Sequence, residues 1–453
     1  MKNVLTIAGY DPSGGAGIQA DLKTFSALET NGLSVSTALT VQNSRGVFST
    51  AEIDEDIISK QLNTLATDID IHAIKIGMLY KESVIKVVVS FLEKKACPIV
   101  VLDPILISKN GFWLLKESAI SFLIKHLFPL ATIVTPNIKE AQMLCHFEIK
   151  NDNDIRKSAS IMKGYGPKYV LIKGSSVTPD TVTDLLYNGH NFMSFETTNM
   201  NVHPYLHGTG CAFASAITAY MVKGFDIHES IKKAQSYLRL ISLSPIELGK
   251  GNYYLNHLGI LQRDAEKYAI ISELKSAFLK LSQGRIAELI PEVQSNMVFA
   301  MNKAVSIDEI AGFPGRIAKI DDSIAYVAVP EFGKSRHMAS MILAVMHYFP
   351  HCRSAINIKF SKRIIEICEK LGYTIYSFDR KDEPEEDKNK DGKTLDWGVN
   401  QALAKVQKAP DVIYDTGAHG KEPMVRVIGQ NPSDVTEKII SIKNAISNDS
   451  NNN

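Results

Sequence analysis

The sequence predicts an α/β protein of two domains, and three observations lead to that prediction. The chain has 453 residues, too many for a single core of ordinary size. Its first half alternates short apolar, β-branched segments with amphipathic ones, a pattern typical of a mostly parallel sheet flanked by helices. A second set of strand-like segments follows a charged helical stretch that begins near residue 262 and predicts a smaller α/β domain with its own core.

Six segments of the first half have the composition of buried strands: 4–9, 35–42, 73–79, 98–106, 132–137 and 169–174. Helical patterns lie at 82–95, 117–128, 228–241 and 263–281. Several strands end directly in polar or Gly-rich residues. Because ligands of open α/β sheets bind beyond the carboxyl ends of strands, we expect these residues to share one cleft.

The composition favours a cytoplasmic enzyme that acts on small molecules. Hydrophobic residues make up 45% of the chain and charged residues 22%, and the formal net charge is +1. This balance favours neither nucleic acid nor a membrane surface as a partner. No apolar run approaches the ~20 residues that a membrane span needs. The five cysteines form no CxxC pair, which predicts neither a zinc site nor a disulfide framework. We also expect a homodimer.

Two Gly-rich stretches predict ligand-binding turns. Residues 8–25, AGYDPSGGAGIQADLKTF, place four glycines between a strand and a helix, which lets the backbone approach a ligand closely. In HGTGCAFASAI, Gly208, Thr209 and Gly210 precede a small-residue helix, and a helix N-terminus attracts anions such as phosphate. Cys211 lies at the mouth of this site. From the residues alone it is a nucleophile, a metal ligand, a general base or a packing residue.

Seven motifs occur in order and carry a resemblance: AGYDPSGGAG, VQNSRGV, KIGML, VLDPIL, TPNIKEA, LIKGS and HGTGCAFASAI. Residues 1–260 resemble the hydroxymethylpyrimidine and phosphohydroxymethylpyrimidine kinases of thiamine synthesis, members of the ribokinase-like superfamily. The resemblance implies a mostly parallel sheet and the use of ATP and Mg²⁺. It also implies a pyrimidine site formed by Gly9, Asp21, Gln42, Met78 and Ile105. Without it, Met78 would be assigned to the core.

The resemblance also implies the phosphate-binding part of the kinase site. Asn137 and Lys173 would lie along the nucleotide phosphates with the Gly208–Gly210 loop, and Asp103 and Glu140 would organise Mg²⁺. Cys211 would be the base for the hydroxymethyl group, with a pKa lowered at the helix N-terminus. The chain departs from the family at 173–176, where Lys-Gly-Ser-Ser replaces the common KGGH.

The second half carries another set of motifs: PEVQSNMVFAM, GFPGRI, FGKSRHMASMI and DTGAHGKEPMVRVIG. They resemble the archaeal-type thiamine-phosphate synthase domain over residues 265–445. The resemblance implies that Arg316 and His337 are central to catalysis. A strand-end loop carries the candidate ligand residues Asp415, Gly417, Gly420 and Glu422, whose acids would help to hold Mg²⁺–diphosphate. We expect a solvated loop at 379–393 and a disordered tail at 446–453.

Together these resemblances predict a bifunctional enzyme of thiamine synthesis. The first domain would phosphorylate hydroxymethylpyrimidine and its monophosphate with ATP. The second would couple the diphosphate to thiazole phosphate, giving thiamine phosphate and diphosphate. The alternative is a pyridoxal- or sugar-type kinase fused to a non-catalytic domain that senses a thiamine ligand. A sugar kinase would have aspartate at position 211, which argues against a sugar substrate and leaves pyridoxal open.

Overall fold

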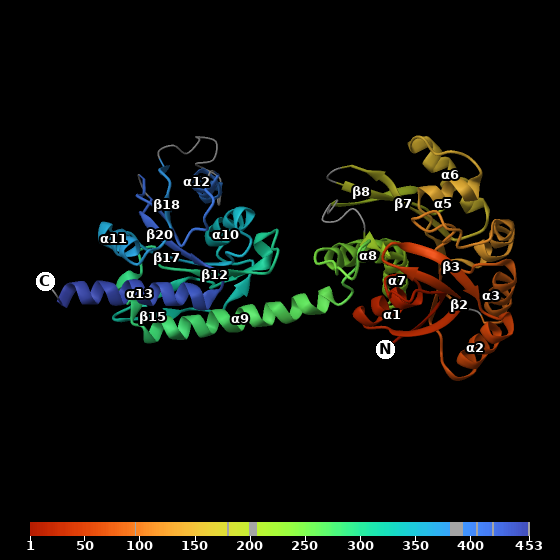
Figure 1. Ribbon diagram of the computed structural model, residues 1–453, viewed down its shortest axis with the longest axis horizontal. Helices are drawn as coiled ribbons and strands as arrows, with labels where there is room; N and C mark the ends of the chain where they lie inside the picture. Colours follow the sequence, from red (N-terminus) through yellow and green to blue (C-terminus); the bar gives the residue numbers. More distant parts are fainter. Residues whose placement is uncertain are drawn as a thin grey trace. The chain divides into compact units, whose positions relative to one another are not determined.

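The computed structural model describes residues 1–95, 97–178, 181–198, 206–380, 393–404, 406–418 and 421–451. The chain folds into two compact units, Met1–Leu261 and Gln262–Asn453, each built around its own sheet (Figure 1). The predicted α/β architecture with a second unit is confirmed.

The first unit contains a nine-stranded sheet of order β3-β2-β1-β4-β5-β6-β7-β8-β9. The six strands from β2 to β7 are parallel, as the sequence predicts, and each predicted segment contributes one of them. Strands β3, β8 and β9 add antiparallel edges that the sequence did not predict. The strands are β1 Asn3–Tyr10, β2 Asn31–Asn43, β3 Gly46–Glu52, β4 Ala73–Ile76, β5 Val100–Leu102, β6 Ile133–Val134, β7 Tyr169–Val177, β8 Thr181–Tyr187 and β9 Phe192–Thr198.

Helices cover both faces of this sheet (Figure 1). One face packs against α1 Gly17–Ala27, α7 Thr209–Val222 and α8 Ile227–Ser242. The other packs against α2 Glu55–Asp68, α3 Glu82–Lys94, α5 Ile138–Cys145 and α6 Asp152–Gly164. The helix predicted over 117–128 is confirmed as a continuous helical segment whose hydrogen-bonding pattern changes along its length, through η1 Glu117–Ala119, α4 Ile120–Phe122, η2 Leu123–Leu127 and η3 Phe128–Leu130. A two-stranded pair, β10 Leu206–His207 and β11 Tyr253–Tyr254, leads into α7.

The second unit contains a seven-stranded sheet of order β16-β13-β12-β17-β20-β19-β18, in which only β18 and β19 pair in parallel. Its strands are β12 Met297–Ala300, β13 Ile310–Gly312, β16 Glu331–Phe332, β17 Ser354–Lys359, β18 Ile375–Ser377, β19 Val412–Asp415 and β20 Met424–Gly429, and a hairpin of β14 Ile317–Ile320 and β15 Ser323–Tyr326 lies beside them. Helices α10 Arg336–Tyr348 and α12 Lys393–Leu403 pack on one face. Helices α9 Gly259–Gln283, α11 Lys362–Lys370 and α13 Pro432–Asn451 pack on the other.

The predicted disordered tail is wrong for residues 446–451, because α13 continues to Asn451. Ile439 and Ile442 of this helix are buried in the core, and Ala445 and Ile446 pack against it, so burial of an apolar stripe extends the helix past the predicted boundary. Most of the predicted solvated loop lies outside the part of the chain that the structure describes, as do residues 452–453. Within that part, no helix is both long and apolar enough to cross a membrane.

Candidate functional site

A single pocket collects the residues that follow the parallel strands of the first unit. The carboxyl ends of β1, β2, β4, β5, β6 and β7 all open into it, together with the first turn of α7. The predicted residues that line it are Gly9, Gln42, Met78, Asp103, Ile105, Asn137, Glu140, Lys173, Gly208, Thr209, Gly210 and Cys211. Side chains suited to an apolar ring and side chains suited to phosphate therefore share one cavity.

The Gly-rich loop after β1 is folded around the side chain of Asp11. One carboxylate oxygen accepts hydrogen bonds from the backbone N–H and the hydroxyl of Ser13, at 2.8 and 2.6 Å. The other accepts from the N–H groups of Gly15 and Ala16, at 3.0 and 2.8 Å. Burial opposes ionisation of this group, which is 2% exposed, but the bonds from His207 and Ser13 outweigh burial and lower its pKa. The loop is thus built on a carboxylate anion.

One glycine lets this loop close on itself, and another lets the loop before α7 touch it. Gly17 has a φ of +56°, and a Cβ there would lie 2.2 Å from the carbonyl oxygen of Gly9. Gly208 has a φ of +83°, and a Cβ there would lie 1.8 Å from the carbonyl oxygen of Gly15. No side chain fits at either position. The close approach turns the first N–H groups of α7 toward the pocket, where they can bind an anion.

Charged side chains lie on the opposite wall. The ammonium of Lys173 is 2.5 Å from Oδ1 of Asp103. Asn137 and Glu140 form a capping box at the start of α5, with bonds of 2.8 and 3.0 Å. Burial raises the pKa of Glu140 to about 8, with Lys173 opposing the shift and Asp103 adding to it. Glu140 therefore keeps its proton to a higher pH than an ordinary glutamate.

The two carboxyl groups of this wall fit a Mg²⁺ ion whose remaining ligands are phosphate oxygens and water. Among the residues that the structure describes, no group of three or more His, Cys, Asp and Glu side chains is arranged to hold a metal ion. Asp103 and Glu140 supply two carboxyl groups at one wall of the pocket. Mg²⁺ bound through one or two carboxylates, phosphate oxygens and water needs no more than this.

The predicted lowering of the Cys211 pKa is wrong. The thiol is 7% exposed in the first turn of α7. Burial raises its pKa to about 11, and the nearby positive charge of Lys75 only partly opposes the shift. The thiol is therefore protonated at neutral pH. The sequence indicated the helix N-terminus correctly but could not reveal how completely the sulfur is buried.

Asp21, predicted to bind the pyrimidine, does not line the pocket. It is fully buried beneath it, where its oxygens accept hydrogen bonds from Thr6 Oγ1 at 2.6 Å and Ser215 Oγ at 2.7 Å. The ammonium of the fully buried Lys75 lies 2.9 Å away. Asp21 thus compensates a buried cation and ties α1 to β1, β4 and α7. The prediction fails because proximity in a motif does not distinguish a wall from the layer behind it.

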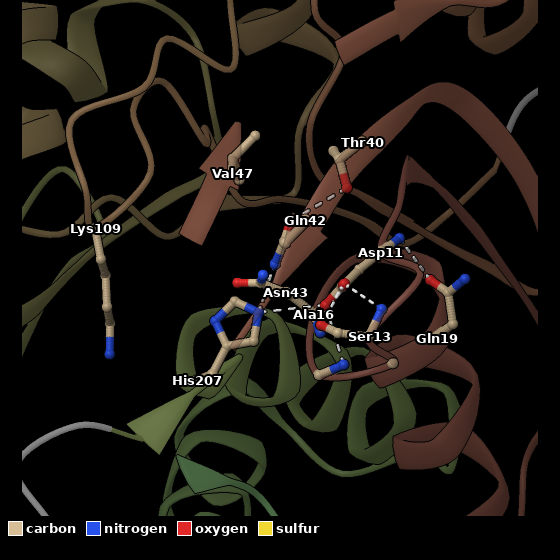
Figure 2. Close-up of polar contacts among 12 residues, drawn as sticks. Asp11, Ser13, Ala16, Gln19, Thr40, Gln42, Asn43, Val47, Lys109 and His207 are labelled. Carbon is tan, nitrogen blue, oxygen red and sulfur yellow. Dashed lines mark hydrogen bonds and ion pairs between the residues drawn. The ribbon is translucent and has the colours of Figure 1, made fainter. Parts of the chain in front are cut away.

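The structure adds pocket residues that the sequence analysis did not assign, most notably His207 (Figure 2). Its Nε2 atom lies 2.7 Å from the side-chain nitrogen of Gln42 and 3.2 Å from Oδ2 of Asp11. Its position in the HGTG motif was the available signal. Lys109 also lines the pocket and donates a hydrogen bond of 2.5 Å to the carbonyl of Leu206, and burial lowers its pKa. Nothing in the sequence around Lys109 pointed to this role.

The residues at which the chain departs from KGGH do not line the pocket. Ser175 and Ser176 lie in the β7–β8 hairpin and do not line the cavity. The Ser175 hydroxyl donates to the carbonyl of Thr183 at 2.9 Å. Gly174 adopts a φ of +59° and donates its N–H to Asp184 at 2.8 Å. Lys173 is thus the member of this motif that reaches the site.

In the second unit, Arg316 and Glu422 converge on one turn. The guanidinium of Arg316 donates to the carbonyl of Val293, and Arg316 is exposed with a φ of +70°. Both carboxylate oxygens of Glu422 accept backbone N–H groups, from Glu292 at 3.1 Å and Val293 at 3.0 Å. These bonds tie Glu422 to this turn, and its expected role on Mg²⁺–diphosphate stays a prediction.

His337 lies in the first turn of α10, exposed to solvent. The N-cap of this helix, Ser335, packs against β13, since a Cβ on Gly312 would lie 2.9 Å from that of Ser335. The segment that carries Arg316 continues from the same end of β13. The structure therefore brings the two elements that carry Arg316 and His337 together at one corner of the second sheet.

Asp415 is not available to a metal. It is fully buried at the end of β19 and lies 2.7 Å from Nε of Arg380 and 2.9 Å from a guanidinium nitrogen of Arg426. The N–H of Gly417 also donates to it, at 3.0 Å. Two guanidinium groups thus share one carboxylate, so its expected role on Mg²⁺–diphosphate is wrong. Gly420 lies outside the described residues.

Comparison with known proteins covers both units. The sequence model of the family described as phosphomethylpyrimidine kinase matches residues 11–256, and that of thiamine-phosphate synthase ThiN matches residues 273–441. The bifunctional thiamine biosynthesis protein ThiDN of Methanocaldococcus jannaschii is 32% identical over 438 residues, which are 96% of this chain and 97% of that protein.

Other relatives cover the first unit alone. The hydroxymethylpyrimidine/phosphomethylpyrimidine kinase of Haemophilus influenzae is 40% identical over 264 residues, 57% of this chain and 97% of that protein. Among solved structures, the ADP complex of Bacillus subtilis pyridoxal kinase has a TM-score of 0.53 and 32% identity, and covers 58% of this chain and 99% of that one. A Staphylococcus aureus pyridoxal kinase with pyridoxal has a TM-score of 0.53 and 34% identity, over 57% of this chain and 94% of that one.

Proposed function

Because this chain belongs to the family of bifunctional thiamine biosynthesis proteins, with a kinase unit followed by a thiamine-phosphate synthase unit, we propose specific roles for its two sites. The pocket of the first unit phosphorylates hydroxymethylpyrimidine and then its monophosphate with ATP. One observation carries this proposal: Met78, Ile105 and the amide of Gln42 share a cavity with Lys173 and the N-terminus of α7. A flat heterocycle fits the first group, and transferring phosphates fit the second.

The chain's own groups supply the electrostatics of phosphoryl transfer. Lys173 and the first N–H groups of α7 stabilise negative charge on the nucleotide phosphates. Asp103 and Glu140 would hold Mg²⁺, which shields the phosphate charges when bound. Since the Cys211 thiol is protonated, it is not a preformed base. We propose that it borders the substrate hydroxyl, while positioning and charge stabilisation provide most of the rate.

We propose that the second unit joins the pyrimidine diphosphate to thiazole phosphate. The bond between the pyrimidine methylene carbon and the diphosphate oxygen breaks, the thiazole nitrogen bonds to that carbon, and diphosphate leaves with the electron pair. Charge builds on the leaving group, which a guanidinium can bind through two hydrogen bonds. The exposed Arg316 and His337, on elements that meet at one corner, support this assignment.

A reconstitution experiment tests both proposals together. Purified protein given ATP, Mg²⁺, hydroxymethylpyrimidine and thiazole phosphate should yield thiamine phosphate. Accumulation of the pyrimidine diphosphate alone would contradict the synthase assignment and leave the kinase intact. Pyridoxal supplied in place of the pyrimidine tests the activity named for the two structural neighbours. A kcat/KM for pyridoxal above that for hydroxymethylpyrimidine would contradict the kinase assignment.

A further inference from the structure

The side chain of Gln42 presents a hydrogen-bonding conflict at its contact with Thr40 (Figure 2). The hydroxyl of Thr40 lies 2.9 Å from the carbonyl oxygen of Tyr10 and 3.2 Å from the side-chain oxygen of Gln42. Both of those atoms are acceptors, and a threonine hydroxyl has a single hydrogen to donate. The hydroxyl donates this hydrogen to the carbonyl of Tyr10, which is the shorter contact. The oxygens of Thr40 and Gln42 then face each other without a hydrogen between them.

A second conflict lies at the other end of the same amide. Nε2 of His207 is 2.7 Å from the side-chain nitrogen of Gln42, which can only donate, and 3.2 Å from Oδ2 of Asp11, which as a carboxylate can only accept. If Nε2 carries a hydrogen, it satisfies Asp11 but faces the hydrogens of the amide. If it carries none, it accepts from Gln42 but turns a lone pair to the carboxylate.

Exchanging the oxygen and nitrogen of the Gln42 amide resolves both conflicts. The two ends of an amide have nearly the same shape, so no other atom moves. Thr40 then donates to Tyr10 and accepts from the amide nitrogen. The Nε2–H of His207 is shared between the amide oxygen and Asp11. Each hydrogen of this chain of contacts then meets an acceptor.

The imidazole of His207 is held in place for this task. Its ring packs edge-on against Tyr254, with centroids 5.5 Å apart. A Cβ on Gly15 would lie 2.6 Å from Cδ2 of His207 and 2.3 Å from Cδ1 of Tyr254, so the backbone of the Gly-rich loop packs against both rings. Asp11 in turn is fixed by the N–H groups of that loop. The donor that faces Gln42 is therefore rigidly placed.

We propose that His207, held by Asp11, is a positioning residue that fixes the orientation of the Gln42 amide and thereby determines which edge of a pyrimidine the kinase accepts. The inference rests on the proposed function, in which Gln42 meets the ring edge. The substrate edge places a ring-nitrogen acceptor beside an amino donor. The 4-oxo analogue reverses this order, with a ring N–H beside a carbonyl. An amide of fixed orientation matches one order, and a freely rotating amide can match both.

The test compares kcat/KM for hydroxymethylpyrimidine with that for its 4-oxo analogue in the full-length protein. We expect the wild type to favour the amino compound and His207→Phe to lower this ratio at least about tenfold, with the KM for ATP unchanged. Phenylalanine keeps the packing on Tyr254 but donates no hydrogen bond. His207→Gln, whose amide nitrogen can donate to both acceptors, should restore much of the ratio.

A second variant keeps the inference testable should His207→Phe fail to fold. Thr40→Val retains the side-chain shape but removes the acceptor at the nitrogen end of the amide, and it should lower the ratio in the same direction. An unchanged ratio in whichever of the two variants folds would overturn the inference. A wild-type protein that phosphorylates neither compound overturns the proposed function, and this inference with it.

Discussion

Glu140 combines a buried position with a place in the proposed nucleotide site. Its pKa is about 8 in the folded protein and near the ordinary 4.5 in the unfolded chain. Between these values the folded state binds more protons, so the contribution of Glu140 to stability is present in acid and is lost as pH rises through 8. Glu140→Gln mimics the protonated form, and its amide oxygen can keep the capping bond to Asn137. We expect this variant to raise Tm by at least about 2 °C near pH 8.5, and the gain to shrink toward pH 4.5.

The same substitution should weaken function, because a neutral amide holds Mg²⁺ less well than a carboxylate. The KM for Mg–ATP should rise while Tm rises, as measured by steady-state kinetics and thermal melts on one preparation. Glu148→Gln is the matched control, since Glu148 is an exposed acid shortly after α5 and should change neither quantity. A lower Tm of Glu140→Gln than of wild type at alkaline pH would contradict the raised pKa of Glu140 in the folded protein.

The raised pKa of Cys211 leads to a prediction about pH. A reaction that needed the thiolate would accelerate about tenfold per pH unit up to about 11. We expect instead that kcat for both phosphorylation steps is nearly flat between about pH 7 and 9, and that Cys211→Ser lowers it by less than about tenfold. A steep alkaline rise in the wild type that Cys211→Ser abolishes would identify the thiolate as the base.

Arg316 is the residue on which the proposed coupling reaction depends most directly. Arg316→Ala should lower the rate of thiamine phosphate formation by about 10²-fold or more, because it removes a donor to the developing diphosphate charge. Pyrimidine diphosphate should then accumulate at the wild-type rate. Lys319→Ala, which removes an exposed positive charge from the adjacent strand β14, is the control and should leave both steps unchanged.

At the scale of elements, the buried pair of Lys75 and Asp21 joins β4 to α1 beneath the pocket. Lys75→Met leaves the Asp21 carboxylate buried without its cation and should lower the free energy of unfolding by about 3–5 kcal/mol. Adding Asp21→Asn, which removes the orphaned charge, should recover part of this loss. Urea denaturation of the single and double variants measures it. The outcome that contradicts this is additivity. If Asp21→Asn lowers the free energy of unfolding as much in the Lys75→Met background as it does alone, the two charges do not compensate each other.

Helices and strands were predicted correctly from the sequence where the local pattern of apolar residues agrees with their burial. The predictions were wrong or missing where contacts between distant segments determine the structure. The parallel strands are apolar on both faces, and their carboxyl ends carry polar residues, so both the sheet and the pocket edge were predictable. The segment 117–128 has a helical pattern and is helical, but local periodicity did not predict that its hydrogen bonding changes from 3-10 to α to π as Leu123 and Leu127 reach the core. The antiparallel pairing of the second sheet depends on contacts between distant segments, which local periodicity does not encode.

The same distinction separates the site residues. Asn137 and Lys173 were predictable because Asn137 comes shortly after the buried strand β6 and Lys173 comes directly after the buried part of β7. Asp21 and Asp415 were misassigned because a sequence shows which acids lie near a motif but not which donors surround them. His207 was missed because its role depends on Gln42 and Asp11, which are more than 160 residues away in sequence. Chemistry that needs partners from three loops emerges only when the fold brings them together.

At the scale of the whole molecule, each unit has its own sheet and its own core. The two proposed reactions share one intermediate, the pyrimidine diphosphate. If that intermediate leaves the kinase site freely, a chain active only in the first step can supply a chain active only in the second. Joining the two units in one chain then acts only by raising the concentration of the pyrimidine diphosphate near the synthase site. This effect matters little once the intermediate has accumulated in bulk solution.

Mixing two full-length variants tests this expectation. Asp103→Asn removes a proposed Mg²⁺ ligand and should inactivate the kinase, and Arg316→Ala should inactivate the synthase. We expect the equimolar mixture to form thiamine phosphate after a lag, at a final rate close to that of wild type at the same concentration of each active site. The lag should shorten as protein concentration rises, because it reflects accumulation of the free intermediate. A mixture that stays inactive while added pyrimidine diphosphate restores the reaction would instead show that the intermediate passes between sites of one chain without release.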